Sequence, residues 1–222
     1  MGITRQQRIY RDNLTELPPH LREILLGMVL GDAHIGRYGT GHARIRFMQG
    51  VRQRVFIEHL FALFQDWRWA KELNARVRRK EEKTYTALWF ATFTHPVFTQ
   101  LHEIFYRPRP SGNGWIKVIP DQVAEWITPR VLAYHVMCDG SRNKKSLIIH
   151  TDGYTKKQSQ AYVDGINQAF GLHGYVTRAT QAQWYIRFPA TDLPALQRLL
   201  KPYLLESFYY KLDLPVVAGD KG

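Results

Sequence analysis

Apolar residues recur at helical spacing in two runs that occupy corresponding places in the two halves of the chain. Residues 25–33 read LLGMVLGDA and residues 132–140 read LAYHVMCDG. Each run ends in an aspartate followed by a small residue, Asp32 in the first copy and Asp139 in the second. A repeated helical run of this kind predicts two halves of similar structure.

The segments after each run also match in kind. Alternating apolar and polar positions predict strands, and apolar residues three or four positions apart predict helices. In the first half the pattern indicates a strand at 42–49, a helix at 52–67, strands at 74–80 and 83–93, and a helix at 95–106. In the second half it indicates a polar turn at 141–145, a strand at 146–151, a helix at 156–170, strands at 174–180 and 183–189, and a helix at 192–204. Each half therefore reads as helix, strands, helix, strands, helix, which is an α+β arrangement.

A segment rich in proline and glycine separates the halves. It runs RPRPSGNGWIKVIP over residues 107–120 and cannot continue a helix. We therefore expect an N-terminal half at 1–106, a linker at 107–120 and a C-terminal half at 121–222, with a short helix at 121–126.

Most aromatic residues lie at helical core spacing, so we expect them to pack in the core rather than to stack on bases. The clearest sets are Phe56, Leu60 and Phe64, and Phe98, Leu101 and Phe105.

Charge points to a polyanionic partner. The 222 residues carry 31 lysines and arginines against 19 acidic residues, a net charge of +12. Hydrophobic residues at 45% are typical of a globular protein, so the charge belongs to a folded body rather than to a disordered tail. Cys138 is the single cysteine, which excludes a disulfide framework and a cysteine-rich zinc site. The sequence shows neither a secretory signal nor a membrane-spanning segment, so we expect a protein that is not secreted and makes no membrane contact.

The expected strands of the first half carry their cations on one face, because alternate side chains of a strand share a face. Such a face can reach base edges in the major groove of DNA. The second half is less basic on its sheet and is expected to rely more on neutral hydrogen bonds or on DNA shape. An ordinary solvated sheet face is the alternative for these strands. The candidate DNA-binding residues are His42, Arg44, Arg46, Asn74, Arg76, Arg78 and Lys80 in the first half, and Lys144, Lys145, Thr177, Arg178, Gln183, Tyr185 and Arg187 in the second.

Two glycines in the first run indicate close helix packing. Gly27 and Gly31 lie four residues apart on one helix face, where glycine costs about 1 kcal/mol relative to alanine unless another backbone approaches. The second run has Tyr134 and Cys138 at the matching positions, so one helix supplies space and the other supplies bulk.

If the two runs pack side by side, their aspartates meet at the C-terminal helix ends. Asp32 and Asp139 would repel each other there unless a cation lay between them. Carboxylate oxygens suit magnesium, calcium or manganese better than zinc. For one copy alone, a core helix with a polar end would be the simpler interpretation.

The paired runs resemble the two motifs of the single-chain LAGLIDADG homing endonucleases, most closely the type encoded by the yeast mitochondrial omega intron. The resemblance extends from about residue 21 to residue 212. It implies a pseudo-twofold tandem αββαββα fold, with two antiparallel saddle-shaped sheets over the DNA and a central helix pair.

The resemblance also implies roles for particular residues. Asp32 and Asp139 match the acidic residues that bind the divalent ions. Lys117, in IKVIP, and Lys211, in FYYKL, match lysines near the two active sites, and Gln49 matches a position that hydrogen-bonds active-site water. Neighbours of the aspartates that complete the candidate metal site are Gly31, Ala33, Cys138 and Gly140, although a cysteine inside an apolar helix is usually a small buried apolar residue.

The implied function is sequence-specific, staggered double-strand cleavage of DNA that promotes intron or intein mobility. The resemblance implies Mg²⁺ as the cofactor, Mn²⁺ as a substitute, and Ca²⁺ as an ion that binds without supporting cleavage. We expect a monomer with no obligate protein partner, in a mitochondrion or chloroplast if organelle-encoded and otherwise in a bacterial cytoplasm. Two alternatives remain: a maturase-like RNA-binding splicing cofactor, and a DNA-binding regulator that does not cleave.

Overall fold

The computed structural model describes residues 4–37, 41–180 and 183–215. The N-terminal half expected to begin at residue 1 and the C-terminal half expected to end at residue 222 therefore have end residues outside the described ranges. The described chain forms two compact units. One unit holds residues up to Arg22 together with Asp32–Ile104, and the other holds Glu23–Gly31 together with the chain from Phe105 onward. Most of helix α2 (Pro19–Leu30) is therefore part of the second unit.

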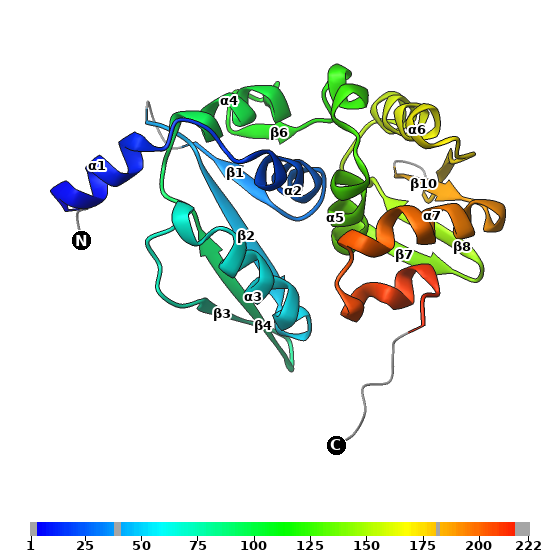
Figure 1. The fold of residues 1–222 in the computed structure, drawn as a ribbon, viewed down its shortest axis with the longest axis horizontal. Helices are drawn as coiled ribbons and strands as arrows, with labels where there is room; N and C mark the ends of the chain where they lie inside the picture. Colours follow the sequence, from blue (N-terminus) through cyan, green and yellow to red (C-terminus); the bar gives the residue numbers. More distant parts are fainter. Residues whose placement is uncertain (1–3, 38–40, 181–182, 216–222) are drawn as a thin grey trace. The chain divides into compact units, whose positions relative to one another are not determined.

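The first unit contains one four-stranded antiparallel sheet with helices (Figure 1). The strand order is β1-β2-β4-β3. Its elements are α1 (Arg5–Asn13), β1 (His34–Gly36), β2 (Arg44–Gly50), α3 (Arg54–Leu63), β3 (Asn74–Lys80), β4 (Lys83–Ala91) and α4 (Pro96–Phe105), with 3₁₀ turns at Val51–Gln53 and Gln65–Trp67.

The second unit repeats this sheet with the order β7-β8-β10-β9, also antiparallel. A short hairpin, β5–β6, precedes it and occupies part of the expected linker. The elements are β5 (Tyr106–Pro108), β6 (Trp115–Lys117), α5 (Pro129–Asp139), β7 (Gly140–Asn143), β8 (Ser146–His150), α6 (Lys156–Phe170), β9 (Tyr175–Arg178), β10 (Trp184–Phe188) and α7 (Leu193–Leu200), with 3₁₀ segments at Asp121–Trp126, Ala190–Asp192, Lys201–Tyr203 and Glu206–Leu212.

The expected α+β class with two antiparallel sheets is confirmed, and the strands follow one another in the same order in both sheets. The turn expected at 141–145 was wrong in its extent, because Gly140–Asn143 form strand β7 and pair with β8. Strand β7 lies at the sheet edge, where polar side chains are tolerated, so its polar sequence resembled a turn. The short strand β1 and the exposed helix α1 were not foreseen.

The aromatic sets expected in the core are buried. In the first unit the ring of Phe47 on β2 stacks on Phe90 of β4 at 4.7 Å and meets Phe64 at 4.9 Å. Helix α3 contacts both β2 and β4, and it covers this side of the sheet (Figure 1). The alternation along residues 74–80 is not matched by burial: Val77 is 60% exposed, because β3 is an edge strand beyond the reach of the covering helix.

Candidate nucleic-acid interface and acidic site

Helices α2 and α5 make a close backbone contact within the second unit. A Cβ added to Gly27 would lie 2.8 Å from the Cβ of Tyr134, and one added to Gly31 would lie 2.5 Å from the Cβ of Cys138. Real Cβ atoms essentially never approach so closely, so glycine is required at both positions. The expected pairing of small residues on one helix with bulk on the other is confirmed.

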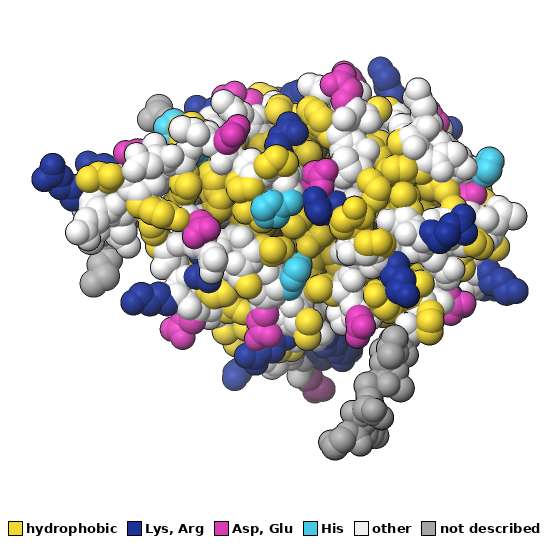
Figure 2. Space-filling view, in the orientation of Figure 1, with side chains coloured by type: hydrophobic (Ala, Val, Ile, Leu, Met, Phe, Trp, Pro, Cys, Tyr) yellow, Lys and Arg dark blue, Asp and Glu magenta, His cyan; other side chains and the backbone are white. Residues whose placement is uncertain are grey.

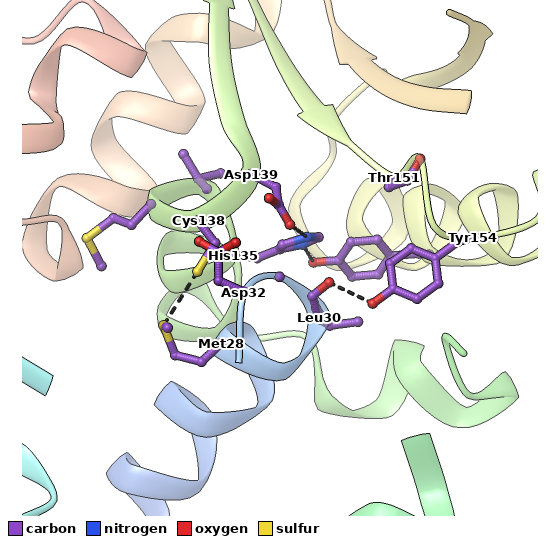
Figure 3. A network of polar contacts seen from close by, with 12 residues as sticks. Met28, Leu30, Asp32, His135, Cys138, Asp139, Thr151 and Tyr154 are labelled. Carbon is purple, nitrogen blue, oxygen red and sulfur yellow. Dashed lines mark hydrogen bonds and ion pairs between the residues drawn. The ribbon is translucent and has the colours of Figure 1, made fainter. Parts of the chain in front are cut away.

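Polar and sulfur contacts flank this helix pair. Arg130 donates to Glu23 at 2.6 Å near the start of α5. The thiol of Cys138 lies 3.5 Å from the sulfur of Met28, inside the helix contact (Figure 3). Cys138 therefore behaves as a small, half-buried packing residue.

Local sequence fixes both ends of α5. The hydroxyl of Thr128 accepts from the backbone N–H of Val131, and Pro129 occupies the first turn, where its missing N–H costs nothing. Asp139 is the last helical residue. Its carboxylate therefore lies at the negative end of the helix dipole.

Lys211 caps the carboxyl end of α5. Its ammonium donates to the carbonyl oxygens of Val136 at 2.9 Å, Met137 at 2.7 Å and Cys138 at 3.4 Å. The side chain is only 5% exposed, and it lies 5.0 Å from the ring centre of Phe208. A buried cation on the last carbonyls of a helix offsets their partial negative charge. Lys211 thus holds the end of α5 on which Asp139 stands.

Lys117 makes the matching contact with the end of α2. Its ammonium donates to the carbonyl oxygen of Gly31 at 2.7 Å. The hydroxyl of Tyr154 donates to the carbonyl oxygen of Leu30, also at 2.7 Å (Figure 3). Burial is the main cause that raises the pKa of Tyr154, with Asp139 adding to it, so the hydroxyl remains a donor.

A hollow of about 270 Å³ opens beside these two helix ends in the second unit. Asp139 and Lys117 line it, and the loop after β8 contributes Asp152 and Tyr154. Asp152, which stands near the place in the second half that corresponds to Gln49, is exposed at this hollow. An open hollow with a carboxylate and an ammonium is suited to a phosphate and its counter-ion.

Gln49 contacts the other aspartate, within the first unit. Its side-chain amide donates to Oδ2 of Asp32 at 2.8 Å. Gln49 is buried at the end of β2, whereas Asp32 is exposed. A buried amide that holds an exposed carboxylate fixes its direction, as partners behind a metal ligand do.

The residues next to the two aspartates were the other candidates for the metal site, and each of them is either already hydrogen-bonded or buried. The carbonyls of Gly31 and Cys138 already accept from Lys117 and Lys211. Ala33 is fully buried, and Gly140 is buried at the C-cap of α5, where its N–H donates to Val136. The carboxylates of Asp32 and Asp139 are therefore the better ligand atoms.

The described residues contain no cluster of three or more histidine, cysteine, aspartate or glutamate side chains that could hold a metal ion. A donor set of single carboxylates fits a hard divalent cation that keeps several of its waters. It does not fit a closed zinc site.

Strand register places the predicted cations of the first unit on one sheet face. Arg46 pairs with Ala91 and Met48 with Trp89, while Asn74 also pairs with Trp89, so these residues share a face. The same alternation puts Arg44, Arg76, Arg78 and Lys80 on it. Figure 2 shows Lys and Arg side chains along the lower margin of the face in view, mixed with Asp and Glu side chains, near the end of this sheet where β3 and β4 turn.

Two hollows follow this basic face. The larger, about 680 Å³, is lined by Arg76 and Arg78 together with Tyr85 on β4. The smaller, about 210 Å³, is lined by Arg44 and Arg46. His42 lies just before β2, where its ring contacts the hydroxyl of Thr99 at 3.4 Å. These hollows carry positive charge along the sheet.

The corresponding sheet of the second unit presents a more neutral face. Tyr185 pairs with Thr177 and with His150, so these three share it, and Arg187 lies two residues further along. Arg178 pairs with Trp184 on the opposite face, with its guanidinium 5.6 Å from that ring. Of the remaining candidates, Gln183 is exposed before β10, and Lys144 and Lys145 are exposed in the β7–β8 turn.

Sequence reasoning missed the polar network behind Asp139. His135, on α5, is fully buried; its Nδ1 lies 2.9 Å from the hydroxyl of Tyr162 and its Nε2 lies 3.8 Å from Oδ2 of Asp139 (Figure 3). Burial is the main cause that lowers the pKa of His135 to about 3, and Lys117 and Lys211 add to it. The available signal was a histidine within an apolar run, one turn before the aspartate.

The chain has relatives among known proteins. Residues 22–196 match the LAGLIDADG DNA endonuclease family. The probable intron-encoded endonuclease 1 of Wickerhamomyces canadensis is 29% identical over 213 residues, which cover 91% of this chain and 88% of that protein. The cytochrome b mRNA maturase bI2 of Saccharomyces cerevisiae is 27% identical over 207 residues, 90% of this chain, but this chain spans only 49% of that maturase.

A solved structure shares the fold over almost the whole chain. The homing endonuclease I-WcaI bound to its DNA recognition sequence matches with a TM-score of 0.86 and 25% identity, over 96% of this chain and 94% of that one. None of the helices in the described ranges is both long and apolar enough to cross a membrane.

Proposed function

Since this chain belongs to the LAGLIDADG DNA endonuclease family, as its two motif runs predicted, we propose that it is a site-specific endonuclease that makes a staggered double-strand break in DNA. The break promotes the mobility of an intron or intein. The fit of the chain to a DNA-bound homing endonuclease over nearly its full length supports this assignment.

The observation that carries the proposal is the contact at Gly31. A Cβ on Gly31 would lie 3.0 Å from Oδ2 of Asp139. Oδ2 of Asp139 therefore lies at the end of helix α2, and Asp32 is the next residue along the chain. From the paired motifs of the family we infer that Asp32 and Asp139 each serve one strand of a duplex.

A divalent cation, Mg²⁺ in our proposal, supplies Lewis acidity at these carboxylates when it is bound, activating water and stabilising the leaving 3′ oxygen. The residues of the chain have separate tasks. Asp32 and Asp139 would hold the cations, Gln49 directs the carboxylate of Asp32, and Lys117 offers a positive charge to a phosphate in its hollow. Lys211 keeps the end of α5 in place, so that Asp139 presents its carboxylate in one direction.

The two sheet faces bind DNA in different ways in this proposal. The first unit supplies cations such as Arg76 and Arg78, which can reach phosphates or guanine edges. The second unit supplies tyrosine, threonine and histidine hydrogen-bonding groups, which read bases without adding much charge. Salt dependence should therefore arise mainly from the first unit.

Cleavage of a randomised duplex library tests the function. With Mg²⁺, the protein is expected to enrich one family of sites cut on both strands, leaving 5′ phosphate and 3′ hydroxyl ends. With Ca²⁺ it is expected to retain the same sites without cutting them. Recovery of bound but uncut duplexes with Mg²⁺ or Mn²⁺ would instead favour a non-cleaving DNA-binding protein.

Neighbouring arginines on β3 offer a matched test of the DNA face. Arg78 lies on the basic face, whereas Arg79 points to the opposite side of the same exposed strand. We expect Arg78→Ala to weaken DNA binding and to reduce the slope of log K against log salt by about 1. Arg79→Ala should leave both nearly unchanged. Equal effects in fluorescence-anisotropy titrations would show that only net charge matters.

RNA binding is the second candidate function, because the bI2 relative is named a maturase. Splicing of the host intron with and without the protein tests it. The same protein should be incubated with DNA of the host gene that lacks the intron. A protein that accelerates splicing but leaves this DNA uncut would be a maturase rather than an endonuclease.

A further inference from the structure

A buried histidine stands one helical turn before Asp139 and inside an otherwise apolar stretch of α5. Both nitrogens of His135 are enclosed, yet Nε2 has no hydrogen-bond partner within the described residues. A buried ring nitrogen without a partner is unfavourable for folding, and an apolar side chain of similar size would avoid that penalty. The histidine therefore points to a role beyond packing.

Tyr162 on α6 is the hydrogen-bond partner of Nδ1 of His135. Burial raises the pKa of the Tyr162 hydroxyl, with Asp139 adding to the effect, so the hydroxyl keeps its proton. Its contact at 2.9 Å is with Nδ1 of His135. A neutral imidazole carries one N–H, so a hydroxyl that donates to Nδ1 leaves the ring proton on Nε2. Nε2, which would carry the proton in that arrangement, lies 3.8 Å from Oδ2 of Asp139.

We propose that His135 is a positioning residue for Asp139: the Tyr162 hydroxyl donates to Nδ1, and the Nε2–H donates to Oδ2 once the carboxylate turns slightly toward it. This inference rests on the proposed function of Asp139 as a cation ligand. The ring would hold one carboxylate oxygen and leave the other, Oδ1, directed away from it toward a cation. Buried donors behind ligating carboxylates set ligand direction in this way.

The tautomer can be measured without DNA or metal. In uniformly ¹⁵N-labelled protein at neutral pH, long-range ¹H–¹⁵N correlation spectra should show His135 neutral, with its proton on Nε2 and none on Nδ1. The variant Tyr162→Phe should increase the Nδ1–H form, because the donor to Nδ1 is gone. A wild-type spectrum with the proton on Nδ1 would overturn the proposal.

Two substitutions separate the contacts of the ring. Glutamine places an amide near the position of Nε2, whereas asparagine places one near Nδ1. We expect His135→Gln to cleave nearly as well as wild type, and His135→Asn and His135→Phe to lose about 10- to 100-fold in cleavage rate and in affinity for Mn²⁺. His102→Phe, at a buried histidine of α4 in the other unit, is the matched control and should change neither.

Three measurements on each variant distinguish positioning from packing. These are the cleavage rate with Mg²⁺, Mn²⁺ binding to the protein–DNA complex by electron paramagnetic resonance, and DNA binding with Ca²⁺. Positioning predicts that His135→Phe keeps wild-type DNA binding but loses Mn²⁺ affinity. Wild-type Mn²⁺ affinity in His135→Phe would overturn the proposal, as would equal losses in all three His135 variants accompanied by weaker DNA binding. If the wild-type protein itself neither cleaves nor binds Mn²⁺, the proposed function fails, and the tautomer measurement still decides the hydrogen-bond arrangement.

Discussion

Replacing Asp139 or Asp32 with asparagine is expected to reduce double-strand cleavage by about 1,000-fold, the upper end of the range for loss of a single electrostatic stabiliser. Asparagine keeps the shape of the side chain but removes the charge that would hold a cation. Each substitution should be measured as the rate of linear product formed from a supercoiled plasmid that carries one site. Residual single-strand nicking would show which strand each aspartate serves.

DNA binding should be retained in both asparagine variants. Asp32→Asn can still accept from Gln49, and Asp139→Asn removes a negative charge from the negative end of α5, so folding should not weaken. Dissociation constants measured with Ca²⁺ are therefore expected to stay near the wild-type value. Asp164→Asn, at an exposed carboxylate of α6 that accepts from Gln160, is the matched control and should cleave normally. Full cutting by either asparagine variant would remove that aspartate from the catalytic site.

Replacing Lys211 with methionine is expected to lower the free energy of unfolding by about 2–4 kcal/mol. Methionine has a similar volume but cannot donate, so the carbonyl groups of Val136 and Met137 would lose a buried partner. Unfolding in urea, followed by circular dichroism, measures the change. A loss of this size would make Lys211 primarily a support for the end of α5.

Substitutions of two other lysines serve as comparisons for this prediction. Lys201→Met changes an exposed residue and should leave stability within about 0.5 kcal/mol of wild type. Lys117→Met should affect cleavage more than stability, because Lys117 is half-buried and lines an open hollow. An unchanged urea midpoint in Lys211→Met would show that water replaces the ammonium at these carbonyls.

Much of the fold could be predicted from sequence periodicity. The duplicated run ending in Asp32 and Asp139 indicated two similar halves, and alternation along residues 44–50 indicated which side chains of β2 face the core. Both signals are local, because the repeat of a helix or strand fixes which residues share a face. Periodicity failed at the sheet edges, where β7 and β3 lack the burial that alternation records.

What the sequence determined by itself was the inventory of chemical groups and their local geometry. Two aspartates follow apolar helices, two glycines lie one turn apart on the first helix, and cations alternate along the strands. The family and its chemistry could be identified from these features, because each depends on spacing within one element.

Tertiary structure decided how deeply each group is buried and which other elements it contacts. Lys117 and Lys211 look equivalent in the sequence, but one lines an open hollow and the other is buried on helix carbonyls. His135 lies one turn before Asp139 on the same helix, but its Nδ1 gains a buried partner only because α6 brings Tyr162 against α5. Such contacts join residues from different elements, and their burial and hydrogen bonding depend on packing that no local pattern encodes.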